Sequence, residues 1–439
     1  MTKHFLSFLL SGFISFASFA QAIDKNKLDQ YFSAFEQSNK FMGSVAVSQN
    51  GKIVYSRSIG YTDIATKTKP DANTKYRIGS ISKTFTSVLV MKAVEEKKLS
   101  LDDKLSKYYP EMLHASKISI SNLLNHRSGI HNFTNDSNYL NWNTKKKSEK
   151  EMLGIIMGGG SDFEPDSKAE YSNSNYVMLA YILQKVYKKP YAKLLTDKII
   201  IPVGLKNTFV GDKINLANNE SYSYKLVSDW EKEEETDMSV PIGAGSVVST
   251  PEDLTRFSDA LFQGKIIKEG SIAIMKSIKD NFGYGLFQMP FNEKRGYGHT
   301  GGIDGFTSVY GYFPDEKVGF ALCSNGSSYN NNNISIVLLS AVFNQPYEIP
   351  NFETYPVTEE ELDAYLGVYE SAQIPLKITV SKSGNTLMAQ ATGQSAFGLD
   401  ATEKDKFKFE QAGVVLEFSP AENKMILKQG GGVYTFIKE

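Results

Sequence analysis

The spacing of apolar residues changes several times near the start of the chain, and each change predicts a different element. Residues 23–39 carry apolar side chains at helical spacing, which predicts an amphipathic helix. Residues 43–48 and 52–57 alternate around Asn50-Gly51, the pattern of a β-hairpin. Residues 84–94 are apolar nearly all round a helix, as expected of a helix enclosed by protein.

Further along, helical segments precede a pair of strands. Helical spacing recurs at 118–125, 174–187, 191–200, 251–262 and 334–343, whereas 307–313 and 318–324 have the pattern of strands. Helices gathered against an antiparallel sheet indicate an α+β fold. Residues 131–150 are rich in Asn, Thr, Ser and Lys, which predicts a long surface loop of the kind that shapes a neighbouring site. The acidic run 231–235 is expected to be solvated surface.

A change in composition marks a domain boundary. Pro346, Pro350 and Pro356 predict an extended linker over residues 346–357. Residues 358–439 open with a helix-capping pattern and continue as short strands separated by turns, which predicts a small antiparallel barrel or sandwich. We therefore expect a catalytic domain over residues 23–345 and a separate β domain over 358–439.

The N-terminus has the form of a secretory signal. Residues 1–22 combine a short basic head, an apolar stretch and the small-x-small sequence Ala20-Gln21-Ala22, which predicts cleavage near Ala22 and a secreted or periplasmic protein. An uncleaved anchor is the alternative, but the apolar stretch is short for a spanning helix of ~20 residues. No later apolar run is long enough to span a bilayer. The single cysteine, Cys323, lies in a predicted buried strand and is interpreted as a core residue.

The composition of the chain limits the classes of binding partner and cofactor that we expect. The 439-residue chain is 41% hydrophobic and 22% charged, enough to bury a large core. Its net charge of -1 gives no electrostatic reason to expect nucleic acid or a membrane surface as a partner. No cluster of Cys, His and Asp has metal-ligand spacing, and no glycine loop follows a strand, so no metal or cofactor is predicted. The expected partner is a small-molecule or peptide substrate, and no oligomeric state is predicted.

The first candidate for chemistry is Ser80-Ile81-Ser82-Lys83, at the head of the buried helix. Side chains at i and i+3 share one helix face, so the hydroxyl of Ser80 and the amine of Lys83 are expected to meet. A desolvated lysine has a lowered pKa and can serve as the base that a serine nucleophile needs. Taken alone, the same four residues are more often a helix cap beside a solvated lysine.

Two further stretches carry suitable chemistry. Tyr171-Ser172-Asn173 precedes a predicted helix and supplies a phenol for proton transfer and an amide for positioning. In Gly298-His299-Thr300-Gly301-Gly302, expected just before a strand, Gly301 and Gly302 would let a substrate backbone approach and leave N–H groups free for an oxyanion. Each stretch alone has an ordinary structural interpretation.

Together the three stretches resemble, in order, the motifs of the serine β-lactamase and penicillin-recognising family. The resemblance is to the branch of class C β-lactamases, D-alanyl-D-alanine carboxypeptidases, D-aminopeptidases and esterases, and it covers residues 28–344. It implies an antiparallel sheet flanked by helices, with an all-helical subdomain. Residues 358–439 are similar to the lipocalin-like β domain that some members append.

The resemblance also implies roles for the candidate residues. Ser80 would form an acyl-enzyme, Lys83 and Tyr171 would share the base and proton-relay work, and Asn173 would orient the lysine and the substrate amide. Backbone N–H groups of Ser80 and Gly302 would form the oxyanion hole. His299 would face the leaving side or carboxylate of the substrate.

The third motif departs from the β-lactamases of this branch. They usually have lysine where this chain has His299, so a fixed cation for a β-lactam carboxylate is missing. A serine peptidase or esterase acting on a D-amino-acid-containing peptide or an ester is therefore placed ahead of a β-lactamase. A non-catalytic penicillin-recognising sensor is a further alternative, and a Ser-His-Asp hydrolase is disfavoured because Ser80 lacks a Gly-x-Ser-x-Gly elbow. His126 is interpreted as a structural residue under the site.

Overall fold

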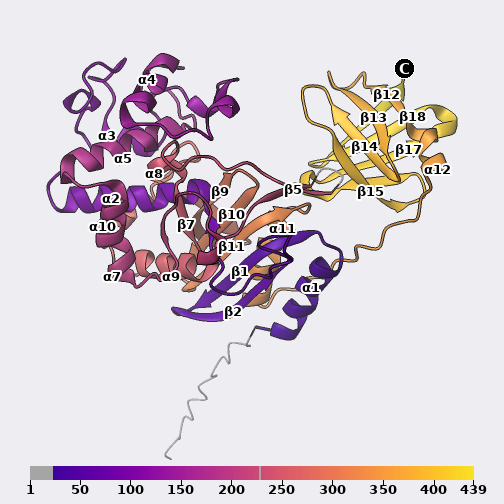
Figure 1. Ribbon diagram of the computed structural model, residues 1–439, viewed down its shortest axis with the longest axis horizontal. Helices are drawn as coiled ribbons and strands as arrows, with labels where there is room; N and C mark the ends of the chain where they lie inside the picture. The colour runs from indigo at the N-terminus through magenta and orange to yellow at the C-terminus, as the bar shows by residue number, and fades with distance from the viewer. Residues whose placement is uncertain (1–22, 227–228) are drawn as a thin grey trace, which may run out of the picture.

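The computed structural model describes residues 23–226 and 229–439. The signal segment expected over residues 1–22 lies outside the described residues. Figure 1 shows a region of helices, a sheet packed against it, and a barrel that an extended segment joins to the sheet. None of the helices in the described ranges has both the length and the apolar character needed to cross a bilayer.

A six-stranded antiparallel sheet is the centre of the larger region. Its order is β2-β1-β11-β10-β9-β8. The strands are β1 (Phe41–Gln49), β2 (Lys52–Ile59), β8 (Phe287–Phe291), β9 (Lys294–Ile303), β10 (Phe306–Phe313) and β11 (Val318–Ser327). The Asn50-Gly51 hairpin forms as predicted and joins β1 to β2. Because β1 pairs with β11, strands from the two ends of this region lie side by side.

Different helices cover the two faces of this sheet. Helices α1 (Lys25–Gln37) and α11 (Asn331–Val342) pack on one face and bury an apolar core that includes Val45 and Phe320. The other face packs against α9 (Pro251–Phe262), whose first turn is capped by the Thr250 hydroxyl as the sequence predicts. Behind α9 lies α2 (Ser82–Glu95), and the rings of Phe85 and Phe257 stack with centroids 3.9 Å apart.

The helical region surrounds α2. Its further helices are α3 (Ile120–Leu124), α4 (Glu149–Gly159), α5 (Asn173–Tyr187), α6 (Tyr191–Leu195), α7 (Ile201–Val203), α8 (Ile242–Gly245) and α10 (Glu269–Met275). Two small sheets complete it: β3 (Tyr76–Arg77), β7 (Val247–Ser249) and β4 (Phe209–Val210) form one, and β5 (Tyr224–Leu226) and β6 (Trp230–Lys232) form the other.

The segment expected to be a surface loop over residues 131–150 packs partly into the protein. Phe133 and Asn143 are buried, so this part of the expectation is wrong. Phe133 joins the core that also contains α2 and α5. The start of α4 at Glu149 is fixed by a capping box in which the Ser148 hydroxyl accepts from the Glu151 N–H.

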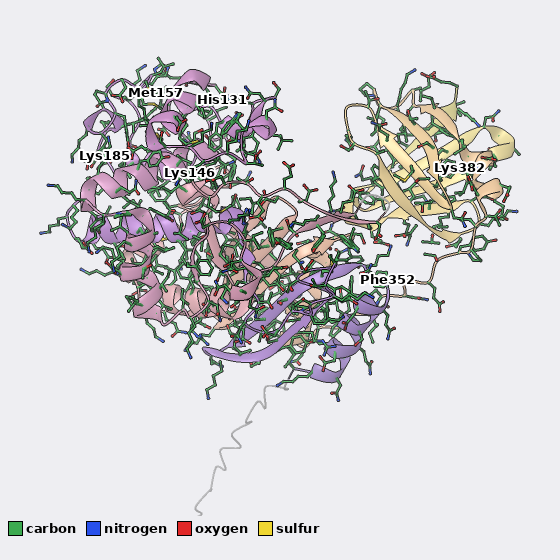
Figure 2. The ribbon with its side chains drawn as sticks, in the orientation of Figure 1. His131, Lys146, Met157, Lys185, Phe352 and Lys382 are labelled. Atoms are coloured by element: carbon green, nitrogen blue, oxygen red, sulfur yellow. The ribbon has the colours of Figure 1, made fainter. Side chains whose placement is uncertain are left out.

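The C-terminal strands form a closed eight-stranded barrel, in which β12 pairs with β19. Its elements are α12 (Glu359–Leu362), β12 (Gly367–Glu370), β13 (Lys377–Ser383), β14 (Thr386–Ala391), β15 (Phe397–Glu403), β16 (Lys406–Phe409), β17 (Val414–Ser419), β18 (Lys424–Gln429) and β19 (Gly432–Lys438). Residues 345–357 form no helix or strand. Figure 2 shows Phe352 of this segment near α1, where its ring lies 4.8 Å from that of Phe35. Lys40 forms an ion pair with Asp400 of the barrel.

Candidate active site

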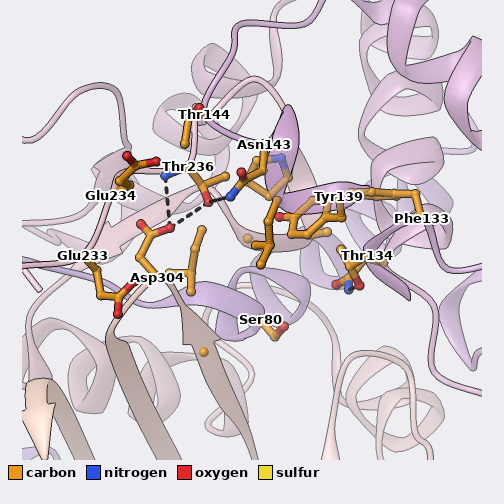
Figure 3. Close-up of a pocket in the computed structure, with 17 residues that line it drawn as sticks. Ser80, Phe133, Thr134, Tyr139, Asn143, Thr144, Glu233, Glu234, Thr236 and Asp304 are labelled. Atoms are coloured by element: carbon orange, nitrogen blue, oxygen red, sulfur yellow. Dashed lines mark hydrogen bonds between the residues drawn. The ribbon is translucent and has the colours of Figure 1, made fainter. Parts of the chain in front are cut away.

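Ser80 lies in a single 3₁₀ turn, Gly79–Ile81, that leads directly into α2. Gly79 has a φ of +49°, and a Cβ there would come within 2.7 Å of the Gly302 carbonyl oxygen. The turn therefore packs directly on β9, and only glycine fits at this position. Ser80 and Gly302 both line a cavity of about 540 Å³ (Figure 3).

The Lys83 amine lies behind Ser80 and is fully buried. Its Nζ is 2.9 Å from Ser80 Oγ, 2.7 Å from Asn173 Oδ1 and 2.8 Å from the Ala244 carbonyl oxygen. Burial lowers the pKa of Lys83 well below its ordinary value, which favours the neutral amine. Neither the amide oxygen nor the carbonyl oxygen can donate a hydrogen bond. A neutral amine therefore gives its two hydrogens to Asn173 and Ala244 and turns its lone pair toward the Ser80 hydroxyl.

The orientation of Asn173 is fixed by residues from the 131–150 segment. The Nδ2 of Asn173 donates to Thr134 Oγ1 at 3.0 Å and to Asn132 Oδ1 at 3.3 Å. The backbone N–H of Asn173 also donates to Asn132 Oδ1, at 2.9 Å. These bonds leave Asn173 Oδ1 facing Lys83. Sequence reasoning missed Asn132 and Thr134, because neither belongs to a motif and both act about forty positions from the residue they hold.

Tyr171 is half-buried, with its ring centroid 4.9 Å from Lys83 Nζ. Burial raises the pKa of the phenol, and its interaction with Ser80 only partly opposes this rise. The phenol thus stays protonated and suits a role as proton donor and relay. The ring stacks on His126 at 4.5 Å, and His126 Nδ1 accepts from the Ser172 N–H at 3.1 Å. These contacts support the structural interpretation of His126.

The third motif stands just before strand β10, as the sequence predicted, and it also lies within a strand of its own, β9, which the sequence did not predict. His299 is buried, its Nδ1 lies 2.5 Å from the Thr300 carbonyl oxygen, and its ring lies 4.3 Å from that of Phe287. Burial, and next the charge of Lys83, lower the pKa of His299 to about 3, so the ring is neutral near pH 7. A neutral imidazole offers no fixed positive charge to a substrate carboxylate.

The two glycines of this motif occupy different surroundings. A Cβ at Gly301 would lie 2.0 Å from the Ile78 carbonyl oxygen, so Gly301 is required for the close packing of β9 on residues 78–79. A Cβ at Gly302 would meet only the Phe306 carbonyl oxygen, at 3.9 Å. The structure brings Gly302 to the cavity beside Ser80, while Gly301 faces the backbone of Ile78.

None of residues 231–235 is buried, as expected of a solvated surface, and two residues of this acidic run also form part of the cavity wall. Glu233 and Glu234 line the cavity that contains Ser80. Glu235 accepts from the buried guanidinium of Arg77 at 3.0 Å, and Asp304 accepts from the same guanidinium at 2.9 Å. Figure 3 shows both glutamates and Asp304 on one side of the cavity, with Phe133, Thr134 and Tyr139 on the other.

No metal site accompanies these residues. Within residues 23–226 and 229–439, no three His, Cys, Asp or Glu side chains are grouped so as to hold a metal ion. Cys323 is a free, buried thiol in β11. The side chains gathered at Lys83 supply a hydroxyl, a buried amine, a phenol and an amide.

Helices packed on an antiparallel sheet, with a serine and a buried lysine at the head of the central helix, define a β-lactamase-like serine hydrolase. A family model described as Beta-lactamase matches residues 28–339, and the chain belongs to this family. Penicillin-binding protein 4* of Bacillus subtilis (strain 168) is 25% identical over 429 residues, covering 91% of this chain and 94% of that protein.

Two further relatives carry more specific names. The teichoic acid D-alanine hydrolase of Staphylococcus aureus is 29% identical over 294 residues, which are 65% of this chain and 70% of that protein. The crystal structure of D-amino acid amidase from Ochrobactrum anthropi SV3, complexed with L-phenylalanine amide, superposes with a TM-score of 0.63 at 25% identity. The superposition covers 73% of this chain and 99% of the amidase chain. The chain is thus a β-lactamase-related serine hydrolase.

Proposed function

We propose that this protein is secreted and hydrolyses a peptide or ester that contains a D-amino acid, through an acyl-enzyme at Ser80. The observation that carries the proposal is the position of the Lys83 amine, which lies 2.9 Å from Ser80 Oγ. The other two partners of the amine, Asn173 Oδ1 and the Ala244 carbonyl oxygen, can only accept hydrogen bonds. This geometry points the lone pair of a neutral amine at the proton that must leave Ser80.

In the acylation step, Ser80 Oγ forms a bond to the substrate carbonyl carbon while Lys83 takes the hydroxyl proton. The oxygen of the tetrahedral intermediate would accept from the backbone N–H groups of Ser80 and Gly302. Collapse of the intermediate breaks the amide or ester bond, and Tyr171 gives its phenolic proton to the leaving nitrogen or oxygen. Lys83 then returns a proton to Tyr171.

Deacylation reverses these roles. A water molecule attacks the acyl carbon, and its proton passes through Tyr171 to Lys83. The bond to Ser80 Oγ breaks, and the serine oxygen recovers a proton from the lysine. Because Lys83 is neutral again at the end, the cycle uses no group outside the described residues.

The relatives support a D-amino-acid substrate. One relative is named for its action on D-amino acid amides, and another is named as a hydrolase of teichoic acid D-alanine. The neutral state of His299 speaks against a substrate held by its carboxylate, so a β-lactam is the less favoured substrate.

The test is to assay the mature protein side by side against p-nitrophenyl esters, D-amino-acid amides and nitrocefin. We expect turnover of the first two classes, with the D-amide preferred over its L-isomer, and slower turnover of nitrocefin. Nitrocefin turnover as fast as that of the esters would favour a β-lactamase instead. No turnover of any of them would contradict the proposal.

A further inference from the structure

The wall of the Ser80 cavity carries an unbalanced negative charge. Three of the residues that line it are acidic, namely Glu233, Glu234 and Asp304, and among the described residues that line it none is Lys, Arg or His. Lys83 lies just behind the wall, and burial lowers the pKa of both Lys83 and His299, which favours the neutral form of each side chain. Among the described residues that line the cavity, the carboxylates are therefore the only charged side chains.

The three carboxylates are not equivalent. One oxygen of Asp304 accepts from Arg77 at 2.9 Å, and the other accepts from the Thr236 N–H and hydroxyl at 3.0 and 2.7 Å. The Asp304 side chain is only 3% exposed, so its charge is neutralised and its oxygens are already used. In contrast, Glu233 and Glu234 have no ion pair or side-chain hydrogen bond with any described residue.

Two lysines lie on the other side of these glutamates, outside the Ser80 cavity. Lys213 and Lys232 line a neighbouring hollow that the same two glutamates border. The Lys232 ammonium lies 3.3 Å from the ring centroid of Tyr222 and forms no ion pair with either glutamate in the described structure. Two carboxylates thus remain available on the wall of the cavity that contains the nucleophile.

We infer that Glu233 and Glu234 select a substrate that carries a protonated amine and no carboxylate near the scissile bond. An ammonium gives charge-assisted hydrogen bonds to carboxylates, and a partly enclosed cavity of one sign of charge concentrates ligands of the opposite sign. The substrate class is then a D-aminoacyl amide or ester with its amino group free. A D-alanyl-D-alanine carboxylate terminus and a β-lactam carboxylate are repelled by the same wall.

This inference rests on the proposed function. One pair of substrates distinguishes a failure of the inference from a failure of the proposed function. D-alanine p-nitroanilide and N-acetyl-D-alanine p-nitroanilide share the scissile bond but differ in the charged amine. The quantity to measure is the ratio of their kcat/KM values. A substitution that lowers kcat/KM equally for both substrates leaves this ratio unchanged.

We expect the wild-type ratio to favour the free amine and to fall about fivefold or more in the double variant Glu233→Gln, Glu234→Gln, because each removed charge contributes up to about fivefold at a partly exposed site. Raising the salt concentration should lower the wild-type ratio and leave that of the double variant unchanged. The matched control is Glu231→Gln, an exposed member of the same acidic run that lines no part of this cavity. Its ratio should equal that of the wild type.

An unchanged ratio in the double variant, or a wild-type preference for the N-acetyl substrate, would overturn the inference. In either case a fluorophosphonate should still label Ser80, and the proposed function would stand. If the wild-type protein is neither labelled nor active on either substrate, the proposed function itself fails.

Discussion

The amine nitrogen of Lys83 lies 2.9 Å from the hydroxyl oxygen of Ser80, and its other two partners, Asn173 Oδ1 and the Ala244 carbonyl oxygen, can only accept hydrogen bonds. Helix α2, which holds Lys83 and follows directly on the turn that holds Ser80, is nearly all buried, which keeps the amine away from water. Burial of the amine and the acceptor-only character of its other two partners both support the proposed roles, with Lys83 as the base and Ser80 as the nucleophile.

Replacing Lys83 with Met keeps the length and apolar stem of the side chain and removes the base. We expect kcat/KM on p-nitrophenyl acetate to fall by about 10²–10⁴-fold, the usual contribution of a general base. Lys92→Met in the same helix, whose amine donates to the Ile266 carbonyl oxygen, is the matched control and should keep its activity. Similar losses in both variants would indicate a general effect on the helix.

The pH dependence follows from the same assignment. Protonated Lys83 cannot accept the serine proton, so kcat/KM should fall as the pH is lowered through the pKa of Lys83. Because burial lowers this pKa, the midpoint of the fall should lie well below the ordinary lysine value of about 10.4. Burial raises the pKa of Tyr171, so loss of its proton should cause no decrease below pH ~10. A midpoint near 10 in the pH profile of an uncharged ester would contradict a neutral lysine base.

Asn132 is predicted to be a positioning residue. Asn132→Ala removes the acceptor that holds both nitrogens of Asn173, so the amide oxygen can turn away from Lys83. We expect kcat to fall by about 10- to 10²-fold with a smaller change in KM, as for a catalytic group that is slightly misplaced. Asn138→Ala, an exposed change in the same segment, should have little effect. A rise in KM at constant kcat would point to substrate binding instead.

Gly301 and Gly302 should respond differently to alanine. A Cβ at Gly301 would lie 2.0 Å from the Ile78 carbonyl oxygen, so the strand must move, at a cost of about 1–3 kcal/mol. Gly301→Ala should therefore lower the midpoint of thermal unfolding. Gly302→Ala meets nothing closer than 3.9 Å and should leave that midpoint unchanged. Equal midpoints for the two variants would show that β9 does not press on residues 78–79.

Local patterns predicted the parts of the fold that depend on neighbours in sequence. Helices α1, α5 and α9 were predicted from their own apolar periodicity, and the β1–β2 hairpin from its Asn50-Gly51 turn. The structure confirms these elements. Strand β9 was missed because four glycines and two basic residues, Lys294 and Arg295, interrupt any alternation of apolar side chains. Gly296, Gly298 and Gly301 are explained by close contacts with other backbone segments, which no local pattern encodes, whereas Gly302 has open space beside it.

The sequence predicted those candidate site residues that belong to recognisable motifs. Ser80, Lys83 and Asn173 are brought into hydrogen-bonding distance as their motif order suggested. Other contacts depend on chain segments that meet only in the folded protein. Asn132 accepts from Asn173, and Glu235 accepts from Arg77, which lies 158 positions away in the sequence. A charge run such as residues 231–235 looks the same in sequence whether it faces solvent or a substrate cavity.

The most direct measurement of the central claim is the mass of the intact protein after reaction with a fluorophosphonate, followed by mapping of the modified peptide. The account predicts one adduct per chain, located on Ser80, and no adduct in Ser80→Ala. The Lys83→Met variant should form the same adduct far more slowly. An adduct that persists in Ser80→Ala, or that maps to another residue in the wild-type protein, would contradict the assignment of Ser80 as the nucleophile.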